Sequence, residues 1–326
     1  MKNNRFGLRL LRNEQGNIFV LAAVSMMAVM GLAALAIDVS YILAARNQLQ
    51  AGVDASALAG AAGLMTSRSE AIQRAIDYAG RNQCIRQPVA VSAGDVTFPS
   101  SSRVRVQSSR QLPLFFAPVL GMANLNIIAD ATAELGSITG ANHLKPFAVP
   151  DFGFDLGERV LIKSGSVGAP GTNPSFFYPT DYPPVNRGNP IPGAAEYERN
   201  IVNGCSGIVK IGDVLQIEPG NMVGPTKQGV DQLMGMDPHA HWDNNSGSVV
   251  GSSYAGYSSP RICIVPLYDP DLPPDSGRNT ITVTGLAVFF IEGMQGKDLY
   301  GRFMEMLTHG DWGSGNTYLY GIHLVE

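Results

Sequence analysis

The chain has 326 residues, of which 45% are hydrophobic and 15% are charged, and its formal net charge is −4. This length allows two domains and this composition can fill a buried core, so a disordered chain is excluded. A weakly acidic chain without a basic stripe does not attract nucleic acid, and we expect no nucleic-acid partner. Three cysteines exclude a disulfide-rich scaffold, and they lack the C-x-x-C spacing of zinc or redox motifs.

The amino terminus places positive charge before a long apolar stretch. The positive side chains are Lys2, Arg5, Arg9 and Arg12. Residues 17–37 follow without a charged side chain, and about 20 apolar residues in a helix cross a bilayer core of about 30 Å. We therefore expect residues 1–16 to be a cytoplasmic basic leader and residues 17–37 a transmembrane helix. The positive-inside rule then puts everything after Asp38 on the outer side.

A cleaved signal peptide is the alternative for this segment, because Ala34-Leu35-Ala36 offers an A-x-A cleavage site. The apolar stretch is longer than the roughly 7 to 15 residues of a signal-peptide core. Helix-forming sequence also continues past this site without an immediate Gly or Pro. Both features favour a retained, single-pass anchor.

Beyond Asp38 the chain keeps good helix formers and no proline as far as Met65, so the same helix should continue outward as a stalk. Gly52, Ser56 and Gly60 place a small residue at every fourth position, which lets another backbone approach closely. The approaching segment is either a helix of another chain, including a second copy in a homo-oligomer, or the next domain of the same chain. The sequence leaves both open.

A second helix should follow the stalk, because Ser67 and Glu70 have capping-box spacing. Residues 95–109 and 123–135 contain apolar residues that alternate with polar ones, which predicts two strands. The proline-bounded residues between these strands predict a short helix.

Residues 38–136 therefore form the helical stalk and a small α+β module. Residues 137–150, which contain Gly140, Pro146 and Pro150, are expected to form a linker.

The amino-terminal block resembles the N-terminal domain of the TadE/TadG-like proteins of the Flp (tight adherence, Tad) pilus-assembly system. The shared features are a short basic leader ending in Gly, an apolar span, Asp38 at its outer end, and the pattern R-x-Q-L-Q-x-x-x-D-A-x-A-L-A-x-A from Arg46 to Ala61. Residues 113–135 resemble the segment that closes the same domain.

Pilins of this system are cut after a Gly and carry Glu at the fifth position of the new chain, but here the fifth position after Gly16 is Leu21. The resemblance therefore favours the TadG-like branch, whose members keep the span as an anchor. It implies a non-enzymatic component of pilus assembly, anchored in the bacterial inner membrane, with its C-terminal domain in the periplasm or outside the cell. The expected partners are other pilus-assembly or pilin proteins, and the stalk is expected to pack on their helices.

Two other functions remain open at this stage. One is a pilin-like structural or tip subunit of an extracellular filament, and the other is a secreted metal-dependent hydrolase.

Residues 151–326 are rich in Gly and Pro and predict a β-rich barrel or sandwich domain that presents a binding surface. The β-prone runs are Arg159–Lys163, Ile208–Ile217, Arg261–Leu267, Thr280–Ile291 and Thr317–Val325. The whole chain is therefore expected to be α+β: a transmembrane helix that continues into a stalk, a small α+β module and a β-rich domain.

The sequence DPHAHWD holds the best candidate metal ligands, because Asp237, His239, His241 and Asp243 are every second residue. In an extended strand all four would point to one side as nitrogen and oxygen ligands. The alternative is a polar turn, since Pro238 and the following Asn and Gly residues favour loops. Phosphate-loop, G-x-S-x-G and H-E-x-x-H motifs are absent, and we expect no cofactor.

Cys205 and Cys263 each adjoin a predicted strand of the exported domain, where a disulfide between them would persist. Cys84 would then remain unpaired. The alternative is three unpaired cysteines, of which those in the β-rich domain are buried, because cysteine is among the most often buried residue types.

Overall fold

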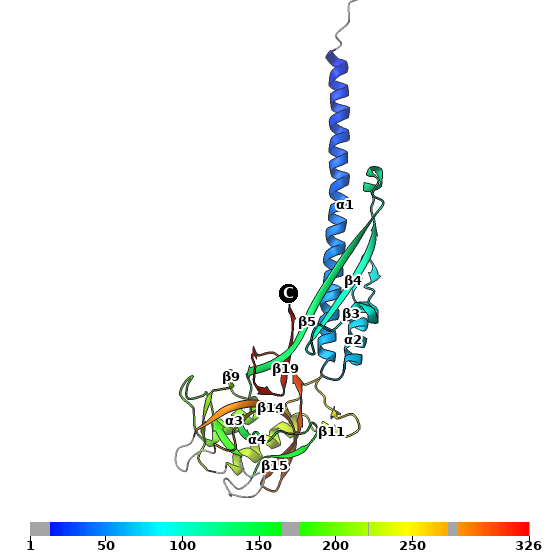
Figure 1. Cartoon of the computed structure of the whole chain (residues 1–326). Coiled ribbons are helices and arrows are strands. Elements are labelled where there is room, and N and C mark those ends of the chain that lie inside the picture. Colours follow the sequence, from blue (N-terminus) through cyan, green and yellow to red (C-terminus); the bar gives the residue numbers. More distant parts are fainter. Residues whose placement is uncertain (1–13, 165–176, 221, 273–279, 326) are drawn as a thin grey trace, which may run out of the picture. The chain divides into compact units, whose positions relative to one another are not determined.

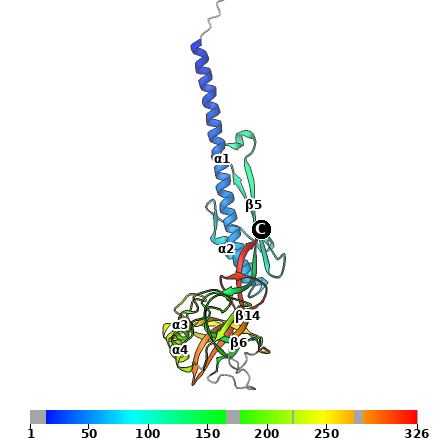
Figure 2. The same ribbon diagram turned by 90° about the vertical axis from the view of Figure 1, so that its left-hand side faces the viewer.

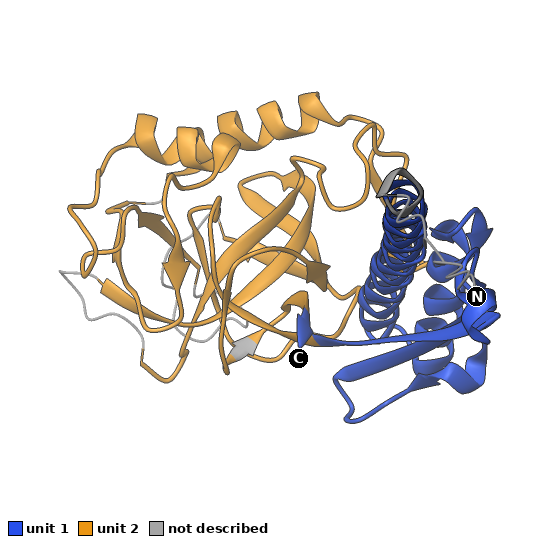
Figure 3. Ribbon diagram, turned by 90° about the horizontal axis from the view of Figure 1, so that it is seen from above, with its two compact units in different colours: residues 1–134, 324–326 blue, residues 135–323 orange. Residues whose placement is uncertain are grey.

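The computed structural model describes residues 14–164, 177–220, 222–272 and 280–325 (Figure 1). The four positive residues of the predicted leader lie outside the described residues. The chain divides into two compact units (Figure 3): unit 1 is Met1–Glu134 with Leu324–Glu326, and unit 2 is Leu135–His323. Unit 1 is α+β and unit 2 is β-rich, which confirms the predicted fold class.

Unit 1 is built on α1, Glu14–Gly63, one uninterrupted helix of 50 residues that contains both the predicted span and the stalk. Its side chains differ sharply in burial along its length. From Ile18 to Ile37 none is buried, whereas Asp38 is buried and buried residues recur from there on, among them Ala45, Leu49 and Val53. The apolar segment is thus the part of the helix that the rest of unit 1 leaves uncovered.

The second helix, α2 at Arg68–Arg81, packs on the stalk through its alanines. Its N-cap is the predicted one: the backbone N–H of Glu70 donates to Ser67 Oγ at 3.0 Å. Ser56 Oγ of α1 donates to the Ala75 carbonyl oxygen at 2.7 Å. The short strands β1 (Gln83–Cys84) and β2 (Gln87–Pro88) follow.

A long antiparallel hairpin completes unit 1 and runs alongside α1 (Figures 1 and 2). Its strands are β4, Arg103–Pro113, and β5, Asn124–Ala141, with β3 (Val96–Thr97) paired to β4. The register runs from Arg103↔Glu134 to Pro113↔Asn124 without a shift. Buried and exposed residues alternate along β4, because one face of the hairpin covers the helix. The short helices η1 (Ala93–Asp95) and η2 (Ala117–Leu120) precede β3 and follow β4.

Unit 2 contains a closed ring of five strands. They are β6 (Phe147–Pro150), β8 (Tyr178–Asp181), β10 (Val214–Ile217), β13 (Ile262–Tyr268) and β14 (Thr280–Gln295). The ring closes because the long strand β14 pairs with β13 over one part of its length and with β10 over another. The outer end of β14 pairs with β15 (Asp298–Met304), which pairs in turn with β7 (Arg159–Lys163).

Alternate residues of β14 enter two different cores. Val288 and Phe290 belong to the core that also holds Leu215 and Leu286. Phe289 and Ile291 pack with helices α3 (Ala194–Asn203) and α4 (Val223–Met236), which cover the other face of the sheet. Neither helix was expected from the sequence. The fully apolar stretch of β14 follows from burial on both faces.

The remaining strands are short or terminal. They are β9 (Val209–Lys210), β11 (His241–Asp243), β12 (Ser248–Val250), β16 (Met306–Leu307), β17 (Asp311–Trp312), β18 (Asn316–Thr317) and β19 (Leu319–Val325). β9 and β17 pair with the end of β5. Residues 137–150, expected to be a linker, therefore include the end of β5 and all of β6. The reason is burial: Ile138 and Ala141 are core residues of unit 2.

Candidate functional site at Asp38 and the hairpin tip

The segment between β4 and β5, residues 114–123, is held to α1 by one side chain. We call these residues the hairpin tip. Asp38 accepts three backbone hydrogen bonds from it: Oδ1 from Phe115 N at 2.8 Å, and Oδ2 from Phe116 N at 2.9 Å and Ala117 N at 2.7 Å. The Asp38 carboxylate is buried beneath these donors. A single acidic residue at the end of the apolar segment therefore fixes the tip against the helix.

The electrostatics of this contact keep Asp38 ionised. Burial raises the pKa of its carboxyl group. The hydrogen bonds from Phe115, Ala117 and Phe116 together lower the pKa by more than burial raises it, so the net pKa lies below the ordinary value. The carboxylate is thus stabilised by backbone dipoles. Carboxylates that accept several backbone N–H groups are among the most strongly stabilised in proteins.

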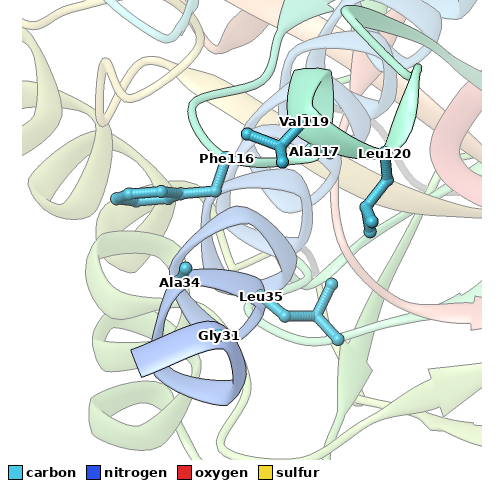
Figure 4. Close-up of a pocket in the computed structure, with 7 residues that line it drawn as sticks. All are labelled: Gly31, Ala34, Leu35, Phe116, Ala117, Val119 and Leu120. Carbon is cyan, nitrogen blue, oxygen red and sulfur yellow. The ribbon is translucent and has the colours of Figure 1, made fainter. Parts of the chain in front are cut away.

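Apolar side chains surround this polar contact. Tyr41 meets the ring of Phe115 edge-on, with 5.0 Å between ring centroids. A pocket of about 270 Å³ lies between the tip and the helix, and Figure 4 shows the residues that line it. It is lined by Gly31, Ala34, Leu35, Phe116, Ala117, Val119 and Leu120. Three of these residues belong to the predicted membrane-spanning segment, so the tip lies beside that segment.

The apolar part of α1 meets the length and composition requirements of a membrane span. The described residues contain one such helix, with a mean hydropathy of 2.5 over its most apolar window, and this window is not buried by any described part of the chain. A core helix of a soluble protein would be covered. An exposed apolar surface of this length indicates contact with a membrane or with a protein partner.

The small-residue stripe of the stalk faces the same chain. A Cβ on Gly52 would lie 2.7 Å from Val89 Cγ2, and one on Gly60 would lie 3.0 Å from Val104 Cγ1. Gly52, Ser56 and Gly60 are all buried. Of the two alternatives for this stripe, the structure therefore has the contact with the chain's own domain, and these positions are not free for a partner helix.

The four candidate metal ligands do not share a strand face. Asp237 follows the last residue of α4, whereas His241 and Asp243 begin and end β11. The buried Asp237 carboxylate accepts hydrogen bonds from Ser252 Oγ and Ser259 Oγ, both at 2.6 Å.

The remaining candidate ligands are also in local contacts. His239 and His241 are exposed, and His241 Nδ1 lies 2.9 Å from the His239 carbonyl oxygen. Asp243 accepts from the backbone N–H groups of Asn245 and Ser246. Within the described ranges, His, Cys, Asp and Glu side chains do not form a group of three or more that could hold a metal ion. The expected metal site is therefore not assembled in this structure, because α4 ends where a continuous strand was assumed.

The predicted disulfide is not formed in the structure either. Cys205 and Cys263 are free and buried, as is Cys84. Cys205 belongs to one core of unit 2 and Cys263 to the other. Their thiols donate instead to the carbonyl oxygens of Gly207 and Phe289. Burial raises the pKa of Cys263 to about 12, so this thiol is protonated and unreactive.

Two buried polar arrangements of unit 2 were not found from the sequence. Arg261 is buried and donates to the carbonyl oxygens of Ala240 at 2.5 Å and Ile291 at 2.9 Å. Asp181 and Glu218 bring two buried carboxyl groups together. Burial and then the hydrogen bond and charge of Glu218 raise the pKa of Asp181 well above its ordinary value, so Asp181 holds a proton at neutral pH.

These arrangements combine residues from distant parts of the sequence. Arg261, which directly precedes β13, and Ile291 of β14 are 30 residues apart, and the pairing of β13 with β14 brings them together. No local sequence pattern identifies such sets.

Comparison with known families assigns the amino-terminal part of the chain. Residues 16–63 match the Flp pilus-assembly TadE/G-like family model, and residues 43–133 match the model of the Tad-like Flp pilus-assembly domain. The two matches span the apolar segment, the stalk, α2 and most of the hairpin. No curated protein and no solved structure matches the chain.

Proposed function

We propose that this chain, a Tad-type pilus-assembly protein by its residues 16–133, acts as a membrane-anchored, non-enzymatic component of Flp pilus assembly. The anchor is the apolar amino-terminal half of α1. The rest of unit 1 forms the base of the exported part, and unit 2 presents a surface to other pilus components. Tad-type domains belong to assembly components, and this supports a structural role over a catalytic one.

One observation carries this proposal: the most apolar window of α1 is left uncovered, while buried residues recur along one face of the same helix from Asp38 onward. Burying an apolar helix of this length in hydrocarbon is strongly favourable, whereas leaving it in water is not. The uninterrupted helix then couples the membrane directly to unit 1.

The sidedness and the branch rest on the sequence. Basic residues precede the span, so both units lie on the outer side of the bacterial inner membrane, in the periplasm or beyond it. Leu21 stands where a cleaved pilin would have Glu after Gly16, which supports the TadG-like branch with a retained span.

A complementation experiment tests this function. The gene is deleted in the bacterium that carries it, and surface filaments are counted by electron microscopy after complementation. We expect the full chain to restore filaments. A second version, in which residues 1–37 are replaced by a cleavable signal peptide, is exported without an anchor and is expected not to restore them, although it accumulates at the same level.

The location of the chain separates this function from the alternatives. We expect it in the membrane fraction and not in sheared filaments. Recovery in sheared filaments in proportion to the major subunit would establish a structural filament subunit instead. Full activity of the anchor-free version would contradict the anchored role.

A further inference from the structure

The depth of the hairpin tip relative to the apolar segment follows from the contacts of unit 1. The pocket in Figure 4 is lined from the helix side by Gly31, Ala34 and Leu35. At 1.5 Å per residue, Gly31 lies about 10 Å along the helix axis from Asp38. Whatever surrounds the last two turns of the apolar segment therefore also surrounds the tip.

The side chains of the tip suit an apolar environment. No residue from Leu112 to Leu125 is charged. Val119 is 88% exposed and Leu120 73% exposed, and Phe115, Phe116 and Met122 are exposed as well. Such a cluster of large apolar side chains on a surface loop marks an interaction site.

The backbone of the tip is suited to the same environment. Most of its N–H groups already have partners within unit 1. The donors are Leu114, Phe115, Phe116, Ala117, Val119, Gly121 and Met122. Three of them donate to Asp38 and the others to carbonyl oxygens within the tip. Pro118 has no N–H group. Satisfied backbone donors are the condition for placing a loop in hydrocarbon, where water cannot complete them.

We propose that the hairpin tip is a second membrane contact, which enters the leaflet on the Asp38 side of the span and takes a lipid acyl chain into the pocket between Leu120 and Leu35. This contact requires the membrane anchor proposed above, because the tip is fixed beside the anchor helix. The occupant is lipid rather than protein because the pocket is continuous with the uncovered apolar surface of that helix. The chain then contacts the membrane through both the anchor helix and the hairpin tip, so α1 cannot rotate freely about its own axis.

Fluorescence quenching by nitroxide-labelled lipids tests the contact in the full-length chain reconstituted into phosphatidylcholine vesicles. An environment-sensitive fluorophore is attached through a Val119→Cys substitution. The introduced thiol replaces an exposed side chain, so the fold should be retained. Val29→Cys, within the span, is the positive control. Ser101→Cys, exposed beyond the far end of β4, is the aqueous control. The unchanged chain with its three buried cysteines gives the labelling background.

We expect the label at position 119 to lose most of its fluorescence to acyl-chain nitroxides, as the label at position 29 does, while the label at position 101 keeps its intensity. Quenching at 29 but not at 119 would overturn the tip contact and leave the anchor intact. Blue-shifted but unquenched emission at 119 would also overturn it, since protein, such as a second copy, would then cover the tip. Absence of quenching at both 29 and 119 would overturn the anchor as well.

Discussion

Asp38 accepts a hydrogen bond of 2.7 Å from the backbone N–H of Ala117, a residue 79 positions later in the chain. This contact joins the end of the apolar segment to the far end of a hairpin. It holds the hairpin tip beside the end of the predicted anchor.

Substitution of Asp38 by Asn should release the hairpin tip. Asn has one acceptor oxygen in place of two, and its amide N–H₂ group would face backbone donors. We expect hydrogen exchange of residues 114–122 to become much faster in Asp38→Asn, measured by mass spectrometry in detergent, with little change in α2. Asp54→Asn is the control, because Asp54 lies on the same helix and accepts from Gln50 instead of the tip. Equal exchange in the two variants would contradict the role of Asp38.

The same contact should depend on pH in a defined direction. The pKa of Asp38 is lowered in the folded chain, so the stabilisation is present above the ordinary value of 3.8 and is lost as the pH falls through the lowered pKa. Exchange of the tip, corrected for the intrinsic pH dependence, should therefore be slow at neutral pH and rise only in acid. Loss of protection in the neutral range would indicate that another group holds the tip.

The close approach of α1 and α2 predicts opposite effects for two Gly→Ala substitutions. A Cβ on Gly63 would lie 2.6 Å from Ala71 Cα, so Gly63→Ala forces backbone apart and should destabilise unit 1 by about 2 kcal/mol. A Cβ added to Gly80 of α2 would have no atom within 4 Å. Because Ala favours a helix more than Gly does, Gly80→Ala should stabilise unit 1 by about 0.5–1 kcal/mol. Both changes in stability can be measured by chemical denaturation in which hydrogen exchange of the α2 amides reports unfolding. Two neutral substitutions would show that this packing is not tight.

Arg261 should be essential for the stability of unit 2. Arg261→Ala removes the guanidinium that donates to the carbonyl oxygens of Ala240 and Ile291, and we expect a loss of about 3 kcal/mol in the free energy of unfolding. Both tryptophans, Trp242 and Trp312, lie in unit 2, so their fluorescence reports its unfolding in urea.

Arg199→Ala is the matched control, because Arg199 is an exposed residue of α3 paired with Glu196. Its removal should cost at most about 1 kcal/mol. An equal loss of unfolding free energy in the two variants would show that the buried hydrogen bonds of Arg261 stabilise unit 2 no more than an exposed ion pair does.

The buried pair of Asp181 and Glu218 should make unit 2 less stable as the pH rises. The pKa of Asp181 is raised on folding, so the folded chain binds more protons than the unfolded chain above the ordinary value of 3.8. Its stabilisation is therefore greatest in acid and is lost as the pH rises through the raised pKa. Asp181→Asn should flatten this dependence, measured by urea unfolding at several pH values. Asp271→Asn, at an exposed loop position, should leave the slope unchanged. A slope that persists in Asp181→Asn would assign it to another group.

Local patterns predicted the parts of the chain whose causes are local. The apolar segment, the Ser67 cap of α2 and the alternation in β4 and β5 each follow from neighbouring residues, and the structure confirms them. α4 could not be predicted in this way. It contains Pro225 and Gly229, and it is held as a helix by burial of Val230 and Leu233 against the sheet.

The candidate sites show the same limit. The sequence marked Asp38 as the outer end of the span, but its three donors lie in the hairpin tip and are set by the register of β4 and β5. The four candidate metal ligands would share one face only in a continuous strand, but α4 ends at Met236 and β11 begins at His241. Gly52, Ser56 and Gly60 lie against other residues of the same chain, and the sequence left this partner open because the contact depends on the tertiary fold.

Alkaline extraction of membranes, followed by intact mass measurement of the extracted chain, tests the anchored role most directly. The account predicts that the protein stays in the membrane pellet and that its mass still includes the apolar segment, residues 17–37. A soluble chain shortened near Ala36, or one that begins after Gly16 and sediments with sheared filaments, would contradict it.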